Sequence, residues 1–185
     1  MREISDRNIL DEFCNKFCAI TEKHCKYIIV SGFVAISSGR SRATEDIDMI
    51  FEKIDSDRFR KLHQELVKEG FVCMQSDSAD EVYSYLKDKL AVRYTLRNQP
   101  LPEMEIKFAK DELDELQLRT RTKIPLTGLD VWFSSIDMNI AFKEELLKSE
   151  KDMKDAEHLR KVYSEQINEE NITHIKQMIK KLRLS

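Results

Sequence analysis

The fold of this chain is decided by residues 27–51, which read YIIVSGFVAISSGRSRATEDIDMIF. Residues 26–30 form a short, mostly apolar run rich in β-branched side chains, which predicts a buried strand. Ser31 and Gly32 then turn the chain into a short helix, and a basic loop leads to a second strand that begins at Asp46. The pattern predicts a strand, a tight turn, a helix, a loop and a strand.

The second strand opens with Asp46 and Asp48. Side chains alternate between the two faces of a strand, so both carboxylates point to one face and Ile47 and Met49 to the other. Two neighbouring carboxylates repel each other unless a cation lies between them. Oxygen ligands suit Mg²⁺ or Mn²⁺ better than zinc, so this strand predicts a divalent-cation site.

The turn before the short helix predicts an anion site. Two of the four glycines of the chain, Gly32 and Gly39, bracket the helix expected at residues 33–38. A glycine at a strand-to-helix turn lets the backbone approach a ligand closely, and the start of a helix presents free N–H groups. Ser31 and Gly32 are therefore candidates for binding phosphate beside the predicted cation.

These residues follow a known order. The spacing resembles the signature of the nucleotidyltransferase superfamily, in which Gly-Gly-x-Ala precedes Gly-x-x-Arg-x-Thr-x-Asp-hydrophobic-Asp. The second part matches position for position, whereas Ser31 replaces the usual first Gly and Val34 the usual Ala. The chain is most similar to small prokaryotic members that resemble the toxins of abortive-infection toxin–antitoxin systems. The matching residues are Gly32, Gly39, Arg42, Thr44, Asp46 and Asp48.

The resemblance implies an α/β (α+β) fold, with a nucleotidyltransferase-type mixed sheet flanked by helices and followed by a C-terminal helical subdomain. We expect the α/β core to span residues 1–134 and the helical subdomain residues 135–185, because the helical pattern continues to the end from Ser135. The active site is expected in the cleft between them.

The resemblance also implies an activity. It predicts transfer of a nucleoside monophosphate from a nucleoside triphosphate to a hydroxyl acceptor, with release of pyrophosphate and with Mg²⁺ or Mn²⁺ as the cofactor. The acceptor stays open between RNA, protein and a small molecule, and a cognate antitoxin-like protein is a candidate partner. The alternative is a catalytically inactive nucleotide-binding or protein-interaction module of the same fold.

The family pattern places a third carboxylate on a strand beside the first pair. Residues 103–108 alternate as a strand in which Glu103, Glu105 and Lys107 share one face. Glu105 is the expected third catalytic carboxylate and metal ligand, with Glu103 as the second choice. An ordinary charged face of an edge strand is the other interpretation. A Glu is longer than the usual Asp, which keeps the inactive module open.

Three residues of the basic loop have expected roles toward the nucleotide. Arg40 is expected to contact the γ-phosphate, and Arg42 to brace Asp46 or the phosphates. Thr44 is expected to hold the turn through its side chain.

The C-terminal part supplies the remaining candidates. Lys143, followed by Lys151, Asp152 and Asp155, falls in the order of the family's C-terminal motif. Lys143 is expected to neutralise the charge of the nucleotide across the cleft. Taken alone, Asp152 and Asp155 are also compatible with a solvated helix face.

Composition limits the function classes. The 185 residues carry a net charge of −3 with 35% charged residues, which disfavours a duplex-DNA binder. No apolar run approaches the roughly 18 residues of a membrane span, and residues 1–11 are too charged for a signal peptide. We therefore expect a cytoplasmic protein without a membrane partner. The cysteines match no common zinc spacing and are expected to be buried hydrophobic residues: Cys14, Cys18, Cys25 and Cys73.

The remaining pattern predicts helices near residues 6–22, 55–70, 78–87 and 171–182, and strands at 71–74 and 91–97. Residues 98–102 are expected to form a turn, and residues 122–133 a hairpin around Thr127 and Gly128. Residues 111–121 fit either a helix or an extended segment. His63 is expected to be exposed on its helix.

Overall fold

The computed structural model describes residues 4–41 and 46–185. Five strands within these ranges form one sheet in the order β1-β2-β5-β4-β3. Strands β2 and β5 are parallel, and the other three neighbouring pairs are antiparallel. The strands are β1 (Tyr27–Val30), β2 (Asp46–Phe51), β3 (Phe71–Cys73), β4 (Val92–Leu96) and β5 (Gln99–Phe108). The predicted mixed α/β fold is confirmed.

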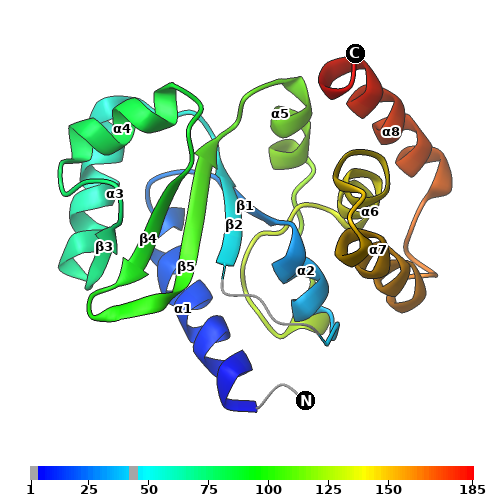
Figure 1. Ribbon diagram of the computed structural model, residues 1–185, viewed down its shortest axis with the longest axis horizontal. Helices are drawn as coiled ribbons and strands as arrows, with labels where there is room; N and C mark the ends of the chain where they lie inside the picture. Colours follow the sequence, from blue (N-terminus) through cyan, green and yellow to red (C-terminus); the bar gives the residue numbers. More distant parts are fainter. Residues whose placement is uncertain (1–3, 42–45) are drawn as a thin grey trace.

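Helices lie on both sides of the sheet (Figure 1). One side carries α1 (Ile4–Glu22), α3 (Ser56–Lys68) and α4 (Ala79–Lys87). The other side carries the short α2 (Gly32–Ser37) and four later helices, which are α5 (Glu112–Arg119), α6 (Ile136–Phe142), α7 (Glu150–Val162) and α8 (Glu169–Arg183).

The alternation along β2 separates the two faces of the sheet. Ile47, Met49 and Phe51 are fully buried in the main hydrophobic core, together with apolar residues of α1, α3 and α4. Asp46 and Asp48 alternate with them and are half-buried. Because a strand has a side-chain period of two, burial of the apolar set turns both carboxylates toward the opposite face.

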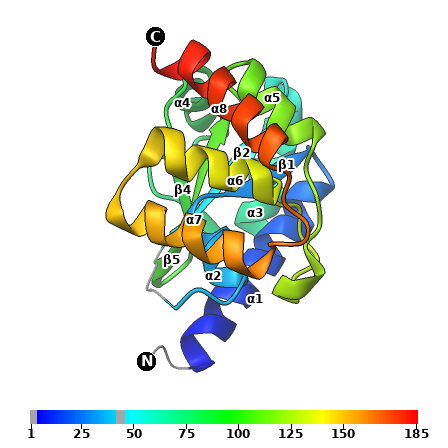
Figure 2. The same ribbon diagram turned by 90° about the vertical axis from the view of Figure 1, so that its right-hand side faces the viewer.

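The C-terminal helices form a layer beyond that opposite face. Helix α6 begins at a Ser135 cap and runs directly into a π-helical turn, Lys143–Leu147. Ser149 and Asp152 then form a capping box that starts α7. Figure 2 looks onto this layer and shows α6 and α7 side by side, with α8 packed against α6.

Most of the predicted helices are confirmed, with bounds shifted by a few residues. The last helix begins earlier than expected, at Glu169 rather than 171, because Asn168 provides the N-terminal cap. Residues 111–121 fitted either a helix or an extended segment, and the structure has a helix there, α5, whose start is capped by Asp111. All four cysteines are buried and unpaired by disulfides, as expected.

The hairpin prediction for residues 122–133 is wrong. Pro125–Thr127 form a 3₁₀ turn that ends at Gly128 with φ 72°, and only single bridges connect Phe133 to Thr122 and to Ile29. Pro125 has no N–H for a strand ladder, which favours the turn instead. The backbone around Phe133 pairs with Ile29 and so covers the open edge of β1.

The turn predicted at residues 98–102 is also wrong. Leu96 pairs directly with Gln99, so the turn contains only Arg97 and Asn98, and both prolines lie inside β5. This part of β5 precedes its pairing with β2, which starts at Glu103, and β4 has a register irregularity opposite it. Prolines are tolerated at such edge and bulge positions because no ladder hydrogen bond is lost.

The prediction that His63 is exposed is wrong as well. The side chain is 4% exposed, and its Nδ1 lies 2.7 Å from the Tyr94 hydroxyl. Burial lowers the pKa of His63.

No helix in the described part of the chain is long and apolar enough to cross a membrane.

Candidate active site

Four carboxylates lie together on one face of the sheet. Asp46 pairs with Glu103, and Asp48 pairs with Glu105, in the parallel register of β2 and β5. Paired residues on adjacent strands lie about 5 Å apart, and alternate residues share a face. We call Asp46, Asp48, Glu103 and Glu105 the acid row. The structure thus brings together Asp46, Asp48 and Glu105, and adds Glu103, the second choice for the third carboxylate.

The acids of the acid row repel one another. Burial, the charge of Glu105 and a hydrogen bond between the two carboxyl groups together raise the pKa of Asp48 to about 6. Lys107 opposes this effect. Burial also raises the pKa of Glu103, with a hydrogen bond to Asp46 as the next cause. A site that holds several acids this closely favours cations or protons.

Arg93 on β4 supplies positive charge next to the acid row. Its Nε lies 3.4 Å from Glu103, and its Nη2 lies 3.7 Å from Glu105. The antiparallel register places Arg93 opposite Glu105. Sequence analysis did not select Arg93, because only the pairing of β4 with β5 brings it here.

The turn beside the acid row is strained. Val30 pairs with Asp48, so Ser31 follows directly next to the acids. Ser31 has φ 67° and ψ −145°, a conformation that glycine adopts far more readily than other residues. It makes no side-chain cap to α2. Ser31 thus has a glycine-like backbone conformation.

The basic loop and the C-terminal helices meet in a buried ion cluster. Asp155 is fully buried, and its carboxylate lies 3.0 Å from Lys143 Nζ and 3.3 Å from Arg40 Nε. Lys143 is also buried, with Asp152 at 4.0 Å. Three of the predicted nucleotide-binding residues therefore contact one another. Their predicted contacts with phosphate stay predictions.

The other predicted residues are more scattered. Lys151 is exposed on the first turn of α7, and Asp152 caps that helix together with Ser149. Gly32 opens α2, directly after the strained turn. Arg42 and Thr44 lie outside the described residues.

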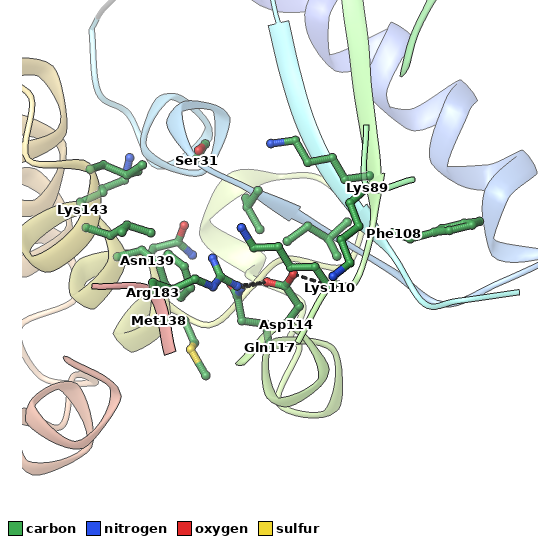
Figure 3. Close-up of a pocket in the computed structure, with 16 residues that line it drawn as sticks. Ser31, Lys89, Phe108, Lys110, Asp114, Gln117, Met138, Asn139, Lys143 and Arg183 are labelled. Atoms are coloured by element: carbon green, nitrogen blue, oxygen red, sulfur yellow. Dashed lines mark hydrogen bonds and ion pairs between the residues drawn. The ribbon is translucent and has the colours of Figure 1, made fainter. Parts of the chain in front are cut away.

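A pocket of about 300 Å³ lies between the sheet and the C-terminal helices, and its lining includes Ile50 and Lys107, which follow the acid row along β2 and β5. Ser31 lies at its edge. Figure 3 shows Lys89 and Lys110 on the sheet side and Asn139, Lys143 and Arg183 on the helical side. Five of its lining residues are basic, which we call the basic pocket: Lys89, Lys107, Lys110, Lys143 and Arg183.

Sequence analysis missed most of this pocket. The alternation of residues 103–108 placed Lys107 on the face of Glu105, which was a usable signal. Lys89, Lys110 and Arg183 come from three separate segments with no local pattern to connect them.

The architecture matches that of solved nucleotidyltransferase-like proteins. An antigenic nucleotidyltransferase-like protein from Paracoccidioides brasiliensis aligns with a TM-score of 0.54 and 16% identity, over 94% of this chain and 87% of that one. The antibiotic-resistance factor ANT(2'')-Ia aligns with a TM-score of 0.56 and 13% identity, over 94% of this chain and 92% of that one. No family model and no curated protein sequence matches the chain. The chain therefore has a nucleotidyltransferase-like fold.

We expect Ser31→Gly to stabilise the protein. Glycine removes backbone strain of about 1–3 kcal/mol, and the greater freedom of the unfolded chain offsets up to about 1 kcal/mol of this gain. Thermal unfolding should show a midpoint higher by about 2–4 °C. Ser31→Ala is the control, because it removes the hydroxyl and keeps the strain. An equal gain in both variants would show that strain is not the cause.

We expect Asp48→Asn to change the pH dependence of stability. The folded chain binds the Asp48 proton more tightly than the unfolded chain, because its pKa is raised from 3.8 to about 6. Protonation of Asp48 therefore stabilises the folded state. This stabilisation is complete below pH 4 and is lost as the pH rises through about 6. The free energy of unfolding of the variant should therefore be higher than that of the wild type by about 1–3 kcal/mol at pH 7.

Denaturant titrations at several pH values measure this difference. Asp88→Asn serves as the control, because Asp88 is an exposed residue. The assignment fails if Asp48→Asn and Asp88→Asn show the same pH profile.

Proposed function

We propose that this chain is a metal-dependent nucleotidyltransferase, which transfers a nucleoside monophosphate from a nucleoside triphosphate to a hydroxyl acceptor and releases pyrophosphate. The observation that carries the proposal is the acid row, placed beside the Ser31 turn by the register of β1, β2 and β5. The nucleotidyltransferase-like fold of the chain supports it.

The acid row has the donor chemistry for Mg²⁺ or Mn²⁺, because all its ligands are carboxylate oxygens. Among the residues described, no three acid, histidine or cysteine groups converge closely enough to hold a metal ion. We therefore propose that Asp46, Asp48 and Glu105 turn toward a common point when the cation binds. A bound cation would screen the phosphate charges and lower the pKa of the acceptor hydroxyl.

The residues around the acid row orient the nucleotide in this proposal. The backbone N–H groups of the turn at Ser31 and Gly32 face the phosphates. Arg40, held by Asp155, positions the start of the basic loop, and Arg42 and Thr44 in that loop keep their predicted roles. Lys143 fixes Asp155 from the helical side and borders the basic pocket.

The finer proposal concerns the biological role. The spacing from Gly39 to Asp48 supports a toxin-type enzyme of a toxin–antitoxin pair, with an antitoxin-like partner. RNA, protein and small molecules remain the acceptor classes.

Two observations favour a second candidate function. The acid groups do not converge in the described residues, and a Glu stands at the position where the family usually has Asp. A catalytically inactive nucleotide-binding or protein-interaction module of the same fold would keep such a site without transferring a nucleotide.

The transfer assay separates the two functions. The purified protein is incubated with Mg²⁺ and each α-³²P-labelled nucleoside triphosphate, and total cellular RNA and protein serve as acceptors. We expect the wild type to transfer label and Asp46→Asn to lose it by about 100-fold or more, since a metal ligand is removed. Asp88→Asn should act like the wild type.

The outcomes are distinct. Transfer by Asp46→Asn at the wild-type rate would remove Asp46 from the site. Nucleotide binding without transfer by the wild type would support the inactive module.

The toxin proposal predicts growth arrest. Induced expression of the wild type in a bacterial host should slow growth, and Asp46→Asn should not, because it lacks the transfer activity. The measurement is the growth rate after induction, at equal protein levels on immunoblots. Equal arrest by both proteins would argue against nucleotidyl transfer as its cause.

A further inference from the structure

The basic pocket holds more positive charge than its internal partners neutralise. Two of its five cations are balanced within the protein. Arg183 contacts Asp111 at 2.5 Å and Asp114 at 3.0 Å, and Lys143 contacts Asp155 at 3.0 Å. The Arg183 pairs hold α8 against α5, and the Lys143 pair holds the π-helical turn against α7, so both cations have a structural role.

The other three cations form no such pairs, although the charge of Lys107 acts on Asp48 and lowers its pKa. Within residues 4–41 and 46–185, no hydrogen bond or ion pair involves the ammonium group of Lys89, Lys107 or Lys110. Asp114, the one acidic residue among the described residues of the lining, is already bound to Arg183. Three like charges around one concavity repel each other, and an anion in the pocket would relieve that repulsion.

The two side-chain amides that line the pocket are already engaged. Asn139 donates to the carbonyl oxygens of Ser134 and Ser135, and Gln117 accepts from the Ser134 hydroxyl at 2.7 Å and donates to Asp114. Recognition of a ligand therefore falls to the ammonium groups, with Ser31 at the edge of the pocket. Ammonium groups act as mobile point charges, which suits phosphate oxygens of variable geometry.

The three lysines continue the face that carries the acid row. Lys107 follows Glu105 by two residues on the same side of β5, which is about 7 Å along the strand. Lys110 follows the end of β5, and Lys89 reaches the pocket from the loop after α4 (Figure 3). The face thus changes from acidic to basic within a distance that one or two phosphate groups can span.

We propose that the basic pocket binds a phosphate-bearing part of a substrate through Lys89, Lys107 and Lys110, while the reacting phosphorus lies at the acid row. The proposal rests on the proposed nucleotidyl transfer for the identity of that substrate. Two sources share this chemistry: the β- and γ-phosphates of the donor nucleotide, and a backbone phosphate next to the acceptor hydroxyl of an RNA strand. A polycationic ligand is disfavoured in the pocket by the same charges.

The test uses a triple variant, Lys89→Gln, Lys107→Gln and Lys110→Gln, in the full chain. Glutamine keeps much of the side-chain length and removes the charge. Lys61→Gln is the matched control, because Lys61 is an exposed lysine on α3. Circular dichroism and the unfolding midpoint establish that each variant is folded.

Equilibrium binding is measured with two probes, inorganic tripolyphosphate and a short single-stranded RNA. We expect the triple variant to bind at least one probe about 10-fold more weakly, with a smaller salt dependence, and Lys61→Gln to bind within about twofold of the wild type. Loss confined to tripolyphosphate assigns the pocket to the donor. Loss confined to RNA assigns it to the acceptor.

Unchanged binding of both probes by a folded triple variant overturns the proposal. This result is distinguishable from failure of the proposed function. If the wild type transfers no label, and the triple variant binds tripolyphosphate more weakly than the wild type, the anion site is supported and the proposed enzyme activity is not. If the triple variant binds both probes and transfers label like the wild type, the enzyme activity is supported and the anion site is not.

Discussion

The parallel, in-register pairing of β2 with β5 is the constraint on which the candidate site depends. Each strand alternates acidic and apolar residues, and the register places Asp46 beside Glu103 and Asp48 beside Glu105. A slip of one residue would bury these carboxylates and expose the apolar set. The main core prevents this slip, because Ile47, Met49, Met104 and Ile106 are fully buried on the opposite face. Burial of the hydrophobic core therefore offsets the electrostatic repulsion within the acid row.

The buried ion cluster is the second element that shapes the site. Asp155 on α7 lies between Lys143 of the π-helical turn and Arg40 of the basic loop. Removing one member would leave a charge buried without its partner, which is strongly destabilising. Contacts of Ser38 with Tyr163 at 2.7 Å and with His158 at 2.9 Å hold the end of α2 against α7 as well. The C-terminal helices thus fix the segment that leads into the acid row.

On the face of the sheet that carries the acid row, acidic and basic groups lie at different ends of the strands. Acidic groups occupy the end of this face where β2 begins and pairs with the middle of β5, and basic groups surround the other end. In the proposed function, the acidic end holds the cation and the reacting phosphate, and the basic end holds further phosphates. No family model matches the chain, so the physical support for the proposed function comes from the acid row and from this division of charge.

By itself, the sequence determined the local elements and the first acid pair. The alternation of residues 46–51 and the turn residues Ser31 and Gly32 act over a few positions, so their patterns predict the strands, the short helix and the shared face of Asp46 and Asp48. Only the tertiary structure decided which segments meet. Arg93, Lys89 and Arg183 reach the site through strand pairing and helix packing between distant segments, and no local pattern encodes such contacts. The burial of Lys143 and His63 was decided in the same way, because burial depends on the neighbours that the fold supplies.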